Sequence, residues 1–314
     1  MSLKKFDRWK GWLYLAPTIV LLLIFTGWPI INTVRMAFLN GYNTMGEVGG
    51  TVFKIGIVNF IRVVEYQGFI TCLKNTMLLC VLTVPISTLL ALLIAVCLNS
   101  IKFLNRFLQT IFFLPYVTNS IAIGMVFAAM FNMVGSFYGT EHEIIITAGI
   151  INNVLGVFGI DPINWINAGS EYWANIVVMV VYIVWNALPF KILILLGGLQ
   201  SVNKQYYEAA KIDSTPKARV FTRITVPLLS PMITYVVITG FIGGFKEYSS
   251  IVGIFGDDMG PAGDPGRLNT MVGYIYDSLG NQEGRASAAA LILFGIIFIV
   301  TKINLAISKR TTYY

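Results

Sequence analysis

Residues 75–99 read NTMLLCVLTVPISTLLALLIAVCLN and contain no charged side chain over 25 positions. An α-helix rises about 1.5 Å per residue, so about 20 apolar residues are enough to cross the roughly 30 Å hydrocarbon core of a bilayer. A helix on the surface of a soluble protein would need a stripe of charged residues facing water, and this run offers none. The stretch therefore predicts a membrane-spanning helix.

Five other stretches have a similar length and few or no charges. The six predicted spans lie at about residues 12–34, 75–99, 109–133, 172–198, 226–251 and 286–307. The first is assigned as a span because its apolar run is too long for a cleaved signal peptide and no small-residue cleavage site ends it before Arg35. Seven prolines lie in or at these helices, which predicts bent axes.

The composition of the whole chain agrees with this fold class. Hydrophobic residues make up 56% of the 314 and charged residues only 12%, whereas soluble domains carry roughly a quarter charged residues. A soluble enzyme is therefore excluded. The net charge of +7 lies in short clusters between apolar runs, without the basic stripe that nucleic-acid binding needs. The chain is expected to be an all-α integral membrane protein, with residues 1–314 in a single transmembrane domain.

The basic residues also predict the orientation. Fourteen Lys and Arg residues fall before the first span, between the second and third, between the fourth and fifth, and from Lys302 to the end of the chain. Six fall in the other connecting segments. Because cytoplasmic loops carry the excess of Lys and Arg, both termini are expected in the cytoplasm.

The sequence offers no catalytic or metal site. It contains no GxxxxGK[ST] phosphate loop, so any work driven by ATP requires another subunit. Its only histidine, His142, stands between Glu141 and Glu143, and a loop position explains it better than a zinc site does. The three cysteines form no CxxC pair.

One cytoplasmic connection, residues 200–227, is too long and too well patterned for a simple link: QSVNKQYYEAAKIDSTPKARVFTRITVP. Ser201 or Asn203 can cap a first short helix, in which Tyr207, Ala210 and Ile212 would share an apolar face. Thr215 and Pro216 can begin a second helix, so that the two would join at residues 213–214. Such a helix can pack on lipid headgroups or insert into a groove of a soluble partner, and the residues alone leave both open.

This loop resembles a known motif. Glu208-Ala209-Ala210, followed by Asp213, Phe221, Ile224, Pro227, Leu228 and Leu229, is similar to the EAA loop of permease subunits in binding-protein-dependent ABC importers. The likeness is closest to the maltose-type, MalF-like sugar permease family and covers nearly the whole chain. Further segments occur in the family's order: Leu114-Pro115-Tyr116, residues 185–200, Gly260-Pro261, Asn269-Thr270 and Gly284-Arg285-Ala286-Ser287-Ala288.

The sequence departs from the family at Ser214, where the family usually has glycine. A residue just after a helix end often needs a positive φ, which glycine adopts without cost. Serine in that conformation costs about 1 kcal/mol, and Asp213 is the alternative residue to adopt it.

The resemblance implies a set of partners for this chain. These are a second permease of similar fold, a dimer of ATP-binding cassette ATPases beneath the membrane, and an extracytoplasmic solute-binding protein above it. The complex would lie in the cytoplasmic membrane of a bacterium. This chain would hold no cofactor and would not be an enzyme, because ATP and Mg²⁺ would bind the ATPase subunits. Coupling to those subunits is carried over to Glu208, Ala209, Ala210, Asp213 and Ser214.

Charged residues inside the predicted spans need an account, since each costs several kcal/mol in hydrocarbon. Lys191 lies about seven residues from a cytoplasmic end, so its ammonium can reach water by snorkelling or face a cavity. Lys246 and Glu247 are adjacent and point to different faces of a helix. They fit either the outer membrane interface or a cavity.

The resemblance also implies a sugar site between three helices. The residues carried over to it are Tyr116, Ser120, Asn186, Ala187, Phe190, Gly244, Lys246 and Glu247. Aromatic rings stack on pyranose faces and polar groups bind hydroxyls. If Lys246 faced the cavity, an acidic sugar would be favoured.

The sequence therefore predicts the membrane subunit of an ATP-driven importer for a sugar or oligosaccharide. The alternative is an ion-coupled secondary transporter acting alone, with Lys246 and Glu247 as the relay. No matching pair of interrupted helices, of the kind found in inverted-repeat carriers, is expected from the sequence. An intramembrane enzyme lacks a catalytic set.

Overall fold

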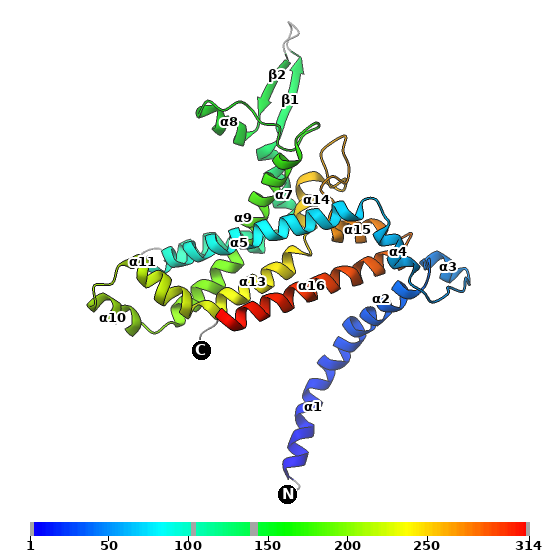
Figure 1. The fold of residues 1–314 in the computed structure, drawn as a ribbon, viewed down its shortest axis with the longest axis horizontal. Helices are drawn as coiled ribbons and strands as arrows, with labels where there is room; N and C mark the ends of the chain where they lie inside the picture. The colour runs from blue at the N-terminus through cyan, green and yellow to red at the C-terminus, as the bar shows by residue number, and fades with distance from the viewer. Residues whose placement is uncertain (1–2, 102–104, 139–143, 312–314) are drawn as a thin grey trace. The chain divides into compact units, whose positions relative to one another are not determined.

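The computed structural model describes residues 3–101, 105–138 and 144–311 (Figure 1). Within these residues, four continuous helical segments are long and apolar enough to cross a membrane: Lys10–Phe38, Phe69–Ser100, Tyr172–Ser201 and Glu283–Ser308. The first of them comprises α1 (Leu3–Leu22), a π-helical turn η1 (Leu23–Gly27) and α2 (Trp28–Phe38). The others lie in α5 (Phe69–Ser100), α9 (Tyr172–Ser201) and α16 (Glu283–Thr311).

Two further spans are broken. Phe107–Val117 and Ser120–Phe131 meet at 100°, and Lys217–Leu228 and Ser230–Gly244 meet at 68°. Counting each bent pair as one span gives the six that the hydrophobic pattern predicts. The fifth ends earlier than predicted, since its helix stops at Gly244 rather than at residue 251. The expectation that no matching pair of the inverted-repeat kind is present stays a prediction.

The first break follows from local chemistry. Helix α6 (Asn105–Phe113) tightens into the 3₁₀ turn η2 (Leu114–Val117), and α7 (Ser120–Phe131) begins anew after it. Pro115 lacks an amide hydrogen, which weakens helix continuation. The Asn119 side chain then accepts hydrogen bonds from the amides of Ile121 at 2.8 Å and Ala122 at 3.3 Å, which caps the new helix.

The second break belongs to a chain of short helical pieces. It runs through α11 (Lys217–Val220), the π-helical η3 (Phe221–Thr225), α12 (Val226–Leu228) and α13 (Ser230–Gly244). Pro227 and Pro231 each fall near the start of a piece, where the missing amide hydrogen costs little.

Smaller elements connect the spans. They are α3 (Thr44–Val48), α4 (Val58–Val64), α8 (Ile150–Val157), α10 (Gln205–Ile212), α14 (Ser249–Phe255) and α15 (Met271–Ser278), with strands β1 (Met133–Tyr138) and β2 (Ile144–Ala148). The strands pair antiparallel with Met133 opposite Ala148. This hairpin adds to the helical fold and has no counterpart in the sequence expectations. His142 lies outside the described residues.

The chain divides into two compact units. One comprises residues 1–69 and 274–294, and the other residues 70–273 and 295–314. The interpretation of the whole chain as one permease domain stays a prediction. The larger unit holds both hydrophobic clusters described below.

Apolar side chains of α5 and α9 form the centre of both clusters in the larger unit. One cluster contains Leu79, Met179, Tyr182 and Ile251, and the other contains Ala91, Leu195, Leu229 and Val236. Helices α5, α9 and α13 therefore pack side by side, as Figure 1 shows.

Hydrogen bonds from a buried amide hold the segment before α15 against α5. The Asn75 amide donates hydrogen bonds to the carbonyls of Arg267 and Asn269, both at 2.9 Å. Tyr172 donates to the other end of the same amide at 2.8 Å. Asn75 is fully buried, so these bonds replace the water that its amide loses.

Helices α7 and α14 cross at two glycines. A Cβ atom on Gly124 would lie 2.6 Å from the Cα of Gly253, and a Cβ on Gly253 would lie 3.0 Å from the Cα of Gly124. No side chain fits at either position. The two glycines thus allow α7 and α14 to approach backbone to backbone.

We expect Gly124→Ala or Gly253→Ala to lower stability by about 1–3 kcal/mol, because each added methyl group must push the two backbones apart. Gly197→Ala is the matched control, since a Cβ there meets nothing within 4 Å and its helix continues on both sides. Thermal unfolding in detergent measures the difference. Equal midpoints for Gly124→Ala and Gly197→Ala would contradict the tight crossing.

Candidate functional site

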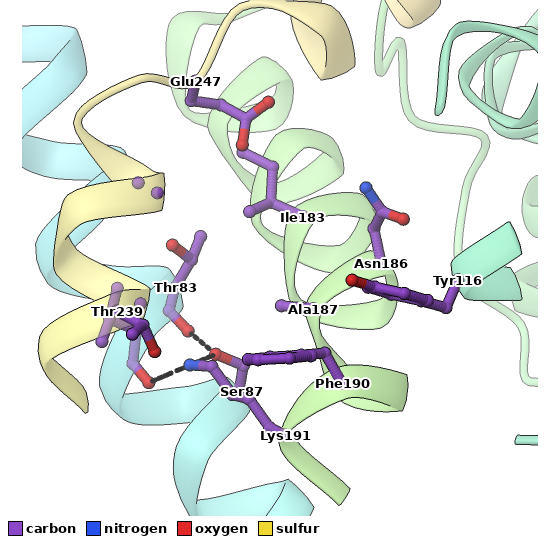
Figure 2. A pocket seen from close by; sticks show the side chains of 14 residues that line it. Thr83, Ser87, Tyr116, Ile183, Asn186, Ala187, Phe190, Lys191, Thr239 and Glu247 are labelled. Carbon is purple, nitrogen blue, oxygen red and sulfur yellow. Dashed lines mark hydrogen bonds between the residues drawn. The ribbon is translucent and has the colours of Figure 1, made fainter. Parts of the chain in front are cut away.

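A cavity of about 320 Å³ lies between α5, α9 and α13, with η2 on one side (Figure 2). Its wall contains both charged and hydroxyl groups within the apolar bundle. The lining residues are Thr83, Val84, Ser87, Tyr116, Ile183, Asn186, Ala187, Phe190, Lys191, Thr239, Gly240, Gly243, Gly244 and Glu247. All of them belong to the larger unit.

Lys191 forms one end of the cavity. Its ammonium donates to Ser87 Oγ at 2.7 Å, Thr88 Oγ1 at 3.0 Å and the Val84 carbonyl at 3.2 Å. Three acceptors match its three hydrogens, which offsets the cost of burying the charge. The residue is only 4% exposed, so the snorkelling interpretation was wrong.

Gly240 leaves the space that the ammonium occupies. A Cβ atom at this position of α13 would lie 3.1 Å from Lys191 Nζ. Three helices therefore meet at Lys191: α9 carries it, α5 supplies its acceptors and α13 gives it room.

Glu247 lines the cavity beyond the end of α13. Its carboxylate accepts a hydrogen bond from the Ser250 amide at 3.2 Å, and its carbonyl accepts one from Thr270 Oγ1 at 2.9 Å. These contacts fix Glu247 at the junction between α13 and α14. The adjacent Lys246 is exposed and does not line the cavity, so the expectation that it does was wrong.

Aromatic and amide groups form the wall on the side of η2. The rings of Tyr116 and Phe190 lie 5.9 Å apart at their centroids and within 18° of parallel. Asn186 lies beside them in Figure 2 and donates to Ser120 Oγ at 3.3 Å. Ser120 also bonds the Tyr182 hydroxyl at 3.0 Å, which places it behind the wall rather than on it.

The structure brings most of the predicted substrate residues together. Those that line the cavity are Tyr116, Asn186, Ala187, Phe190, Gly244 and Glu247. Binding of a ligand by them stays a prediction.

Sequence reasoning missed the contribution of α5. Thr83, Ser87 and Thr88 recur on one face of the uncharged run at helical spacing, and this polar face was a signal that the run borders a cavity. Among the described residues, no three His, Cys, Asp or Glu side chains lie close enough together to hold a metal ion.

The connection before the fifth span folds into the two short helices that its sequence predicts. Asn203, rather than Ser201, supports the start of α10, since its side chain accepts a hydrogen bond from the Gln205 amide at 3.0 Å. At the other end the Thr215 amide bonds the Ala210 carbonyl at 2.9 Å, and the Ser214 amide bonds the Lys211 carbonyl at 3.1 Å. This is the Schellman pattern of helix termination.

Ser214 itself takes the left-handed conformation, with φ at 51°, whereas Asp213 has φ at −74°. The alternative that Asp213 relieves Ser214 was therefore wrong. The Schellman pattern fixes which residue must have a positive φ, and that residue is the one after the cap.

Helix α10 is held to the chain along one edge and exposed along the other. Ala210 is buried, and the Tyr207 hydroxyl lies 3.4 Å from Thr225 Oγ1. Glu208 and Ala209 are exposed, as is Ile212 at 83%. Ile212 therefore does not share the packed face of Tyr207 and Ala210, contrary to expectation.

Comparison with protein families identifies the fold. Residues 87–313 match the model of the family described as binding-protein-dependent transport system inner membrane component. The chain belongs to this family. It is an inner membrane permease, and the matched segment includes the cavity residues from Ser87 onward and the whole connection that contains α10.

Curated relatives of this permease align over nearly their full length. The lactose transport system permease protein LacF of Rhizobium radiobacter is 29% identical, covering 96% of this chain and 94% of LacF. The arabinooligosaccharides transport system permease protein AraP of Bacillus subtilis is 30% identical, covering 95% and 88%. The trehalose/maltose transport system permease protein MalF of Thermococcus litoralis is 25% identical, covering 98% and 96%.

A solved structure has the same fold as this permease. A chain of a bacterial ABC transporter involved in the import of the acidic polysaccharide alginate superposes with a TM-score of 0.75 and 23% identity. The match covers 99% of both chains.

We expect Ser214→Gly in this permease to stabilise the end of α10 by about 1 kcal/mol, because glycine adopts a positive φ without strain. Amide hydrogen exchange of the α10 peptide should slow accordingly. Ser214→Ala, which keeps a Cβ atom, is the control and should leave exchange near that of the unaltered protein. If both variants slow it equally, the strain does not come from φ.

Proposed function

We propose that this permease forms, with a second permease of similar fold, the translocation path of an ATP-driven ABC importer for a sugar or oligosaccharide. The observation that carries the proposal is a cavity between three helices of an inner membrane permease, whose apolar wall carries hydroxyl, amide and charged side chains. The relatives' names, which refer to lactose, arabinooligosaccharides and trehalose or maltose, supply the class of substrate.

The chemistry of the cavity suits a neutral sugar. Its volume of about 320 Å³ falls within the ~300–1,000 Å³ that is typical of small-molecule sites. The Tyr116 and Phe190 rings can pack on the apolar face of a pyranose, while Asn186 and Glu247 can bind hydroxyls. Substrate binding is accordingly assigned to the predicted residues that line the wall, with Thr83 and Thr239 added.

Two observations argue against an acidic sugar in this cavity. Lys246 lies outside it, and the three hydrogens of the Lys191 ammonium are directed at acceptors of α5. A carboxylate would have to displace those acceptors. The other ionisable residue of the wall, Glu247, is acidic and so offers no positively charged partner for an anionic substrate.

The exposed edge of α10 is the proposed contact with the ATPase subunits. Glu208 offers a charge, Ala209 permits a close backbone approach, and the exposed Ile212 offers an apolar contact. ATP and Mg²⁺ are assigned to those partner subunits, so this chain needs no cofactor and hydrolyses nothing itself. The turn at Ser214 sets the direction that the chain takes after α10.

The remaining partner is an extracytoplasmic binding protein that delivers the sugar to the outer face. The family description names binding-protein dependence, and one solved neighbour is a bacterial alginate ABC transporter in complex with an alginate pentasaccharide-bound periplasmic protein. The excess of Lys and Arg on one side supports both termini in the cytoplasm.

The rival function, an ion-coupled transporter acting alone, is weakened by the position of Lys246 outside the cavity. Purification of the chain with its neighbours separates the two functions. Copurification of an ATPase and ATP-dependent uptake support the importer. Uptake by this chain alone in liposomes under an ion gradient would overturn it.

We expect Glu208→Lys to abolish sugar uptake while the protein still inserts, because the reversed charge would repel a basic docking surface. Glu65→Lys, another reversal at an exposed residue, is the control and should transport normally. ATP-dependent uptake into vesicles measures both. Full uptake by the Glu208→Lys protein would show that α10 does not couple.

We expect Asn186→Leu to slow uptake about 3–10-fold, since one hydrogen bond to a sugar hydroxyl contributes about 0.5–1.5 kcal/mol. Basal ATPase activity of the assembled transporter should be unchanged. Asn304→Leu is the matched control, because Asn304 bonds the carbonyl of Val300 within α16. Equal uptake by both variants would place the substrate path elsewhere.

A further inference from the structure

A second cavity, of about 390 Å³, lies in the smaller unit. Its wall consists of two arginines, amide side chains and turn residues, with no aliphatic side chain. The side chains used below are Arg62, Arg285, Asn43, Asn281 and Gln282. Two positive charges and four amide side chains, the fourth being that of Asn59, in one hollow are the donor set of an anion site.

Arg62 brings an uncompensated charge to this cavity. Its guanidinium lies over Gly41, since a Cβ atom built there would be 3.7 Å from Arg62 Nη1. Within the residues that the structure describes, Arg62 forms neither an ion pair nor a hydrogen bond. All five of its N–H groups are therefore free to bind a ligand.

Arg285 is fixed in place by aromatic rings. Its guanidinium carbon lies 4.8 Å from the centroid of the Tyr66 ring and 5.1 Å from that of Tyr274. Its Nε donates to the Tyr274 hydroxyl, and its Nη1 donates to Gln282 Oε1 at 2.9 Å. These contacts use two N–H groups and no carboxylate, so the charge and three donors remain.

The nearby carboxylates are already engaged. Glu47 accepts from Arg35 at 2.8 Å and from the Tyr42 hydroxyl, and these bonds, that of Tyr42 first, hold the pKa of Glu47 below its ordinary value. Glu283 accepts from the amide and hydroxyl of Thr44 at 3.2 and 3.0 Å. Neither acid lines the cavity.

The cavity is held open by a rigid wall. The fully buried Asn59 donates to the carbonyls of Ala37 at 3.0 Å and Leu39 at 2.7 Å, and it accepts from the Gly41 amide at 3.0 Å. These bonds fix the turn over which Arg62 lies. Arg62 therefore meets a ligand against a preformed surface.

The position of the cavity along the spans indicates the source of the anion. Its lining residues follow the end of α2 and begin α16, as Figure 1 shows for α3, α4 and the start of α16. Both spans expose their apolar side chains, including Ile30, Ile31 and Phe294. The ends of two such spans lie at the depth of lipid headgroups.

We propose that this cavity binds the headgroup of an anionic phospholipid of the phosphatidylglycerol type. The phosphate would accept hydrogen bonds from Arg62 and Arg285, and the glycerol hydroxyls would meet the amides of Asn43, Asn281 and Gln282. The acyl chains would extend along the exposed spans. The site does not depend on which sugar is carried, and the predicted orientation places it in the outer leaflet.

Native mass spectrometry of the purified, assembled transporter tests the site. The complex is titrated with phosphatidylglycerol and, separately, with phosphatidylcholine of the same acyl chains. We expect preferential retention of phosphatidylglycerol, and about fivefold weaker binding by Arg62→Gln, since one arginine near an anionic headgroup contributes about 1 kcal/mol. Lys54→Gln, which removes an exposed positive charge of the same unit outside the cavity, should bind as the unaltered protein does.

Arg285→Gln should weaken binding further, but it also removes the contacts with the Tyr66 and Tyr274 rings and can alter the local structure. The test therefore rests on Arg62→Gln. Equal retention by Arg62→Gln and the unaltered protein would overturn the proposal. An equal loss in Lys54→Gln would reduce it to general surface charge and overturn it as well. Displacement of the lipid by millimolar glycerol 3-phosphate would assign the cavity to a soluble phosphate ester instead.

Discussion

The buried ammonium of Lys191 is the interaction on which the substrate cavity depends. It joins α9 to Ser87, Thr88 and Val84 of α5, and it fills the space left by Gly240 of α13. A charge at this depth is stable only while all of its hydrogens have acceptors. The polar contacts of Lys191 and the apolar cluster next to it therefore hold the three helices together at this end of the cavity.

The end of α13 determines which other side chains reach the cavity. Because α13 ends at Gly244, the chain can turn Glu247 into the wall and begin α14 two residues later. Unpaired backbone groups at such a break must find partners within the protein. Glu247 and Thr270 provide them at this end. The same break brings Gly253 against Gly124 and closes the bundle.

The sequence predicts those features that arise from periodicity and composition. Apolar length alone located six spans, and the two-helix pattern of residues 200–227 predicted α10 and α11. Features that arise from a competition between two local structures were missed. Pro115 and the cap at Asn119 together break a span that is apolar throughout. The positive φ lies at Ser214 because α10 ends with Asp213 as its cap, and a positive φ at Asp213 would have required α10 to end one residue earlier.

The candidate site shows the same division. Charged residues in apolar runs drew attention to Lys191, Lys246 and Glu247, but sequence spacing cannot tell which face of a broken helix turns inward. Lys246 and Glu247 are neighbours, yet only Glu247 lines the cavity, because the last turn of α13 has already unwound there. The hydroxyls of α5 were overlooked because Thr and Ser are common in membrane spans, where each can bond its own helix.

A continuous path joins the exposed edge of α10 to this cavity. Tyr207 approaches Thr225 at the start of the fifth span, and Phe221, Val226 and Leu229 pack with Leu195 of α9. From Leu229 the chain runs through α13 to Gly240 beside Lys191. A displacement of α10 by a partner would thus act on a short, bent helix rather than on a straight one. Since α13 gives room to the Lys191 ammonium through a single glycine, even a small shift of this helix would change the end of the cavity that Lys191 forms.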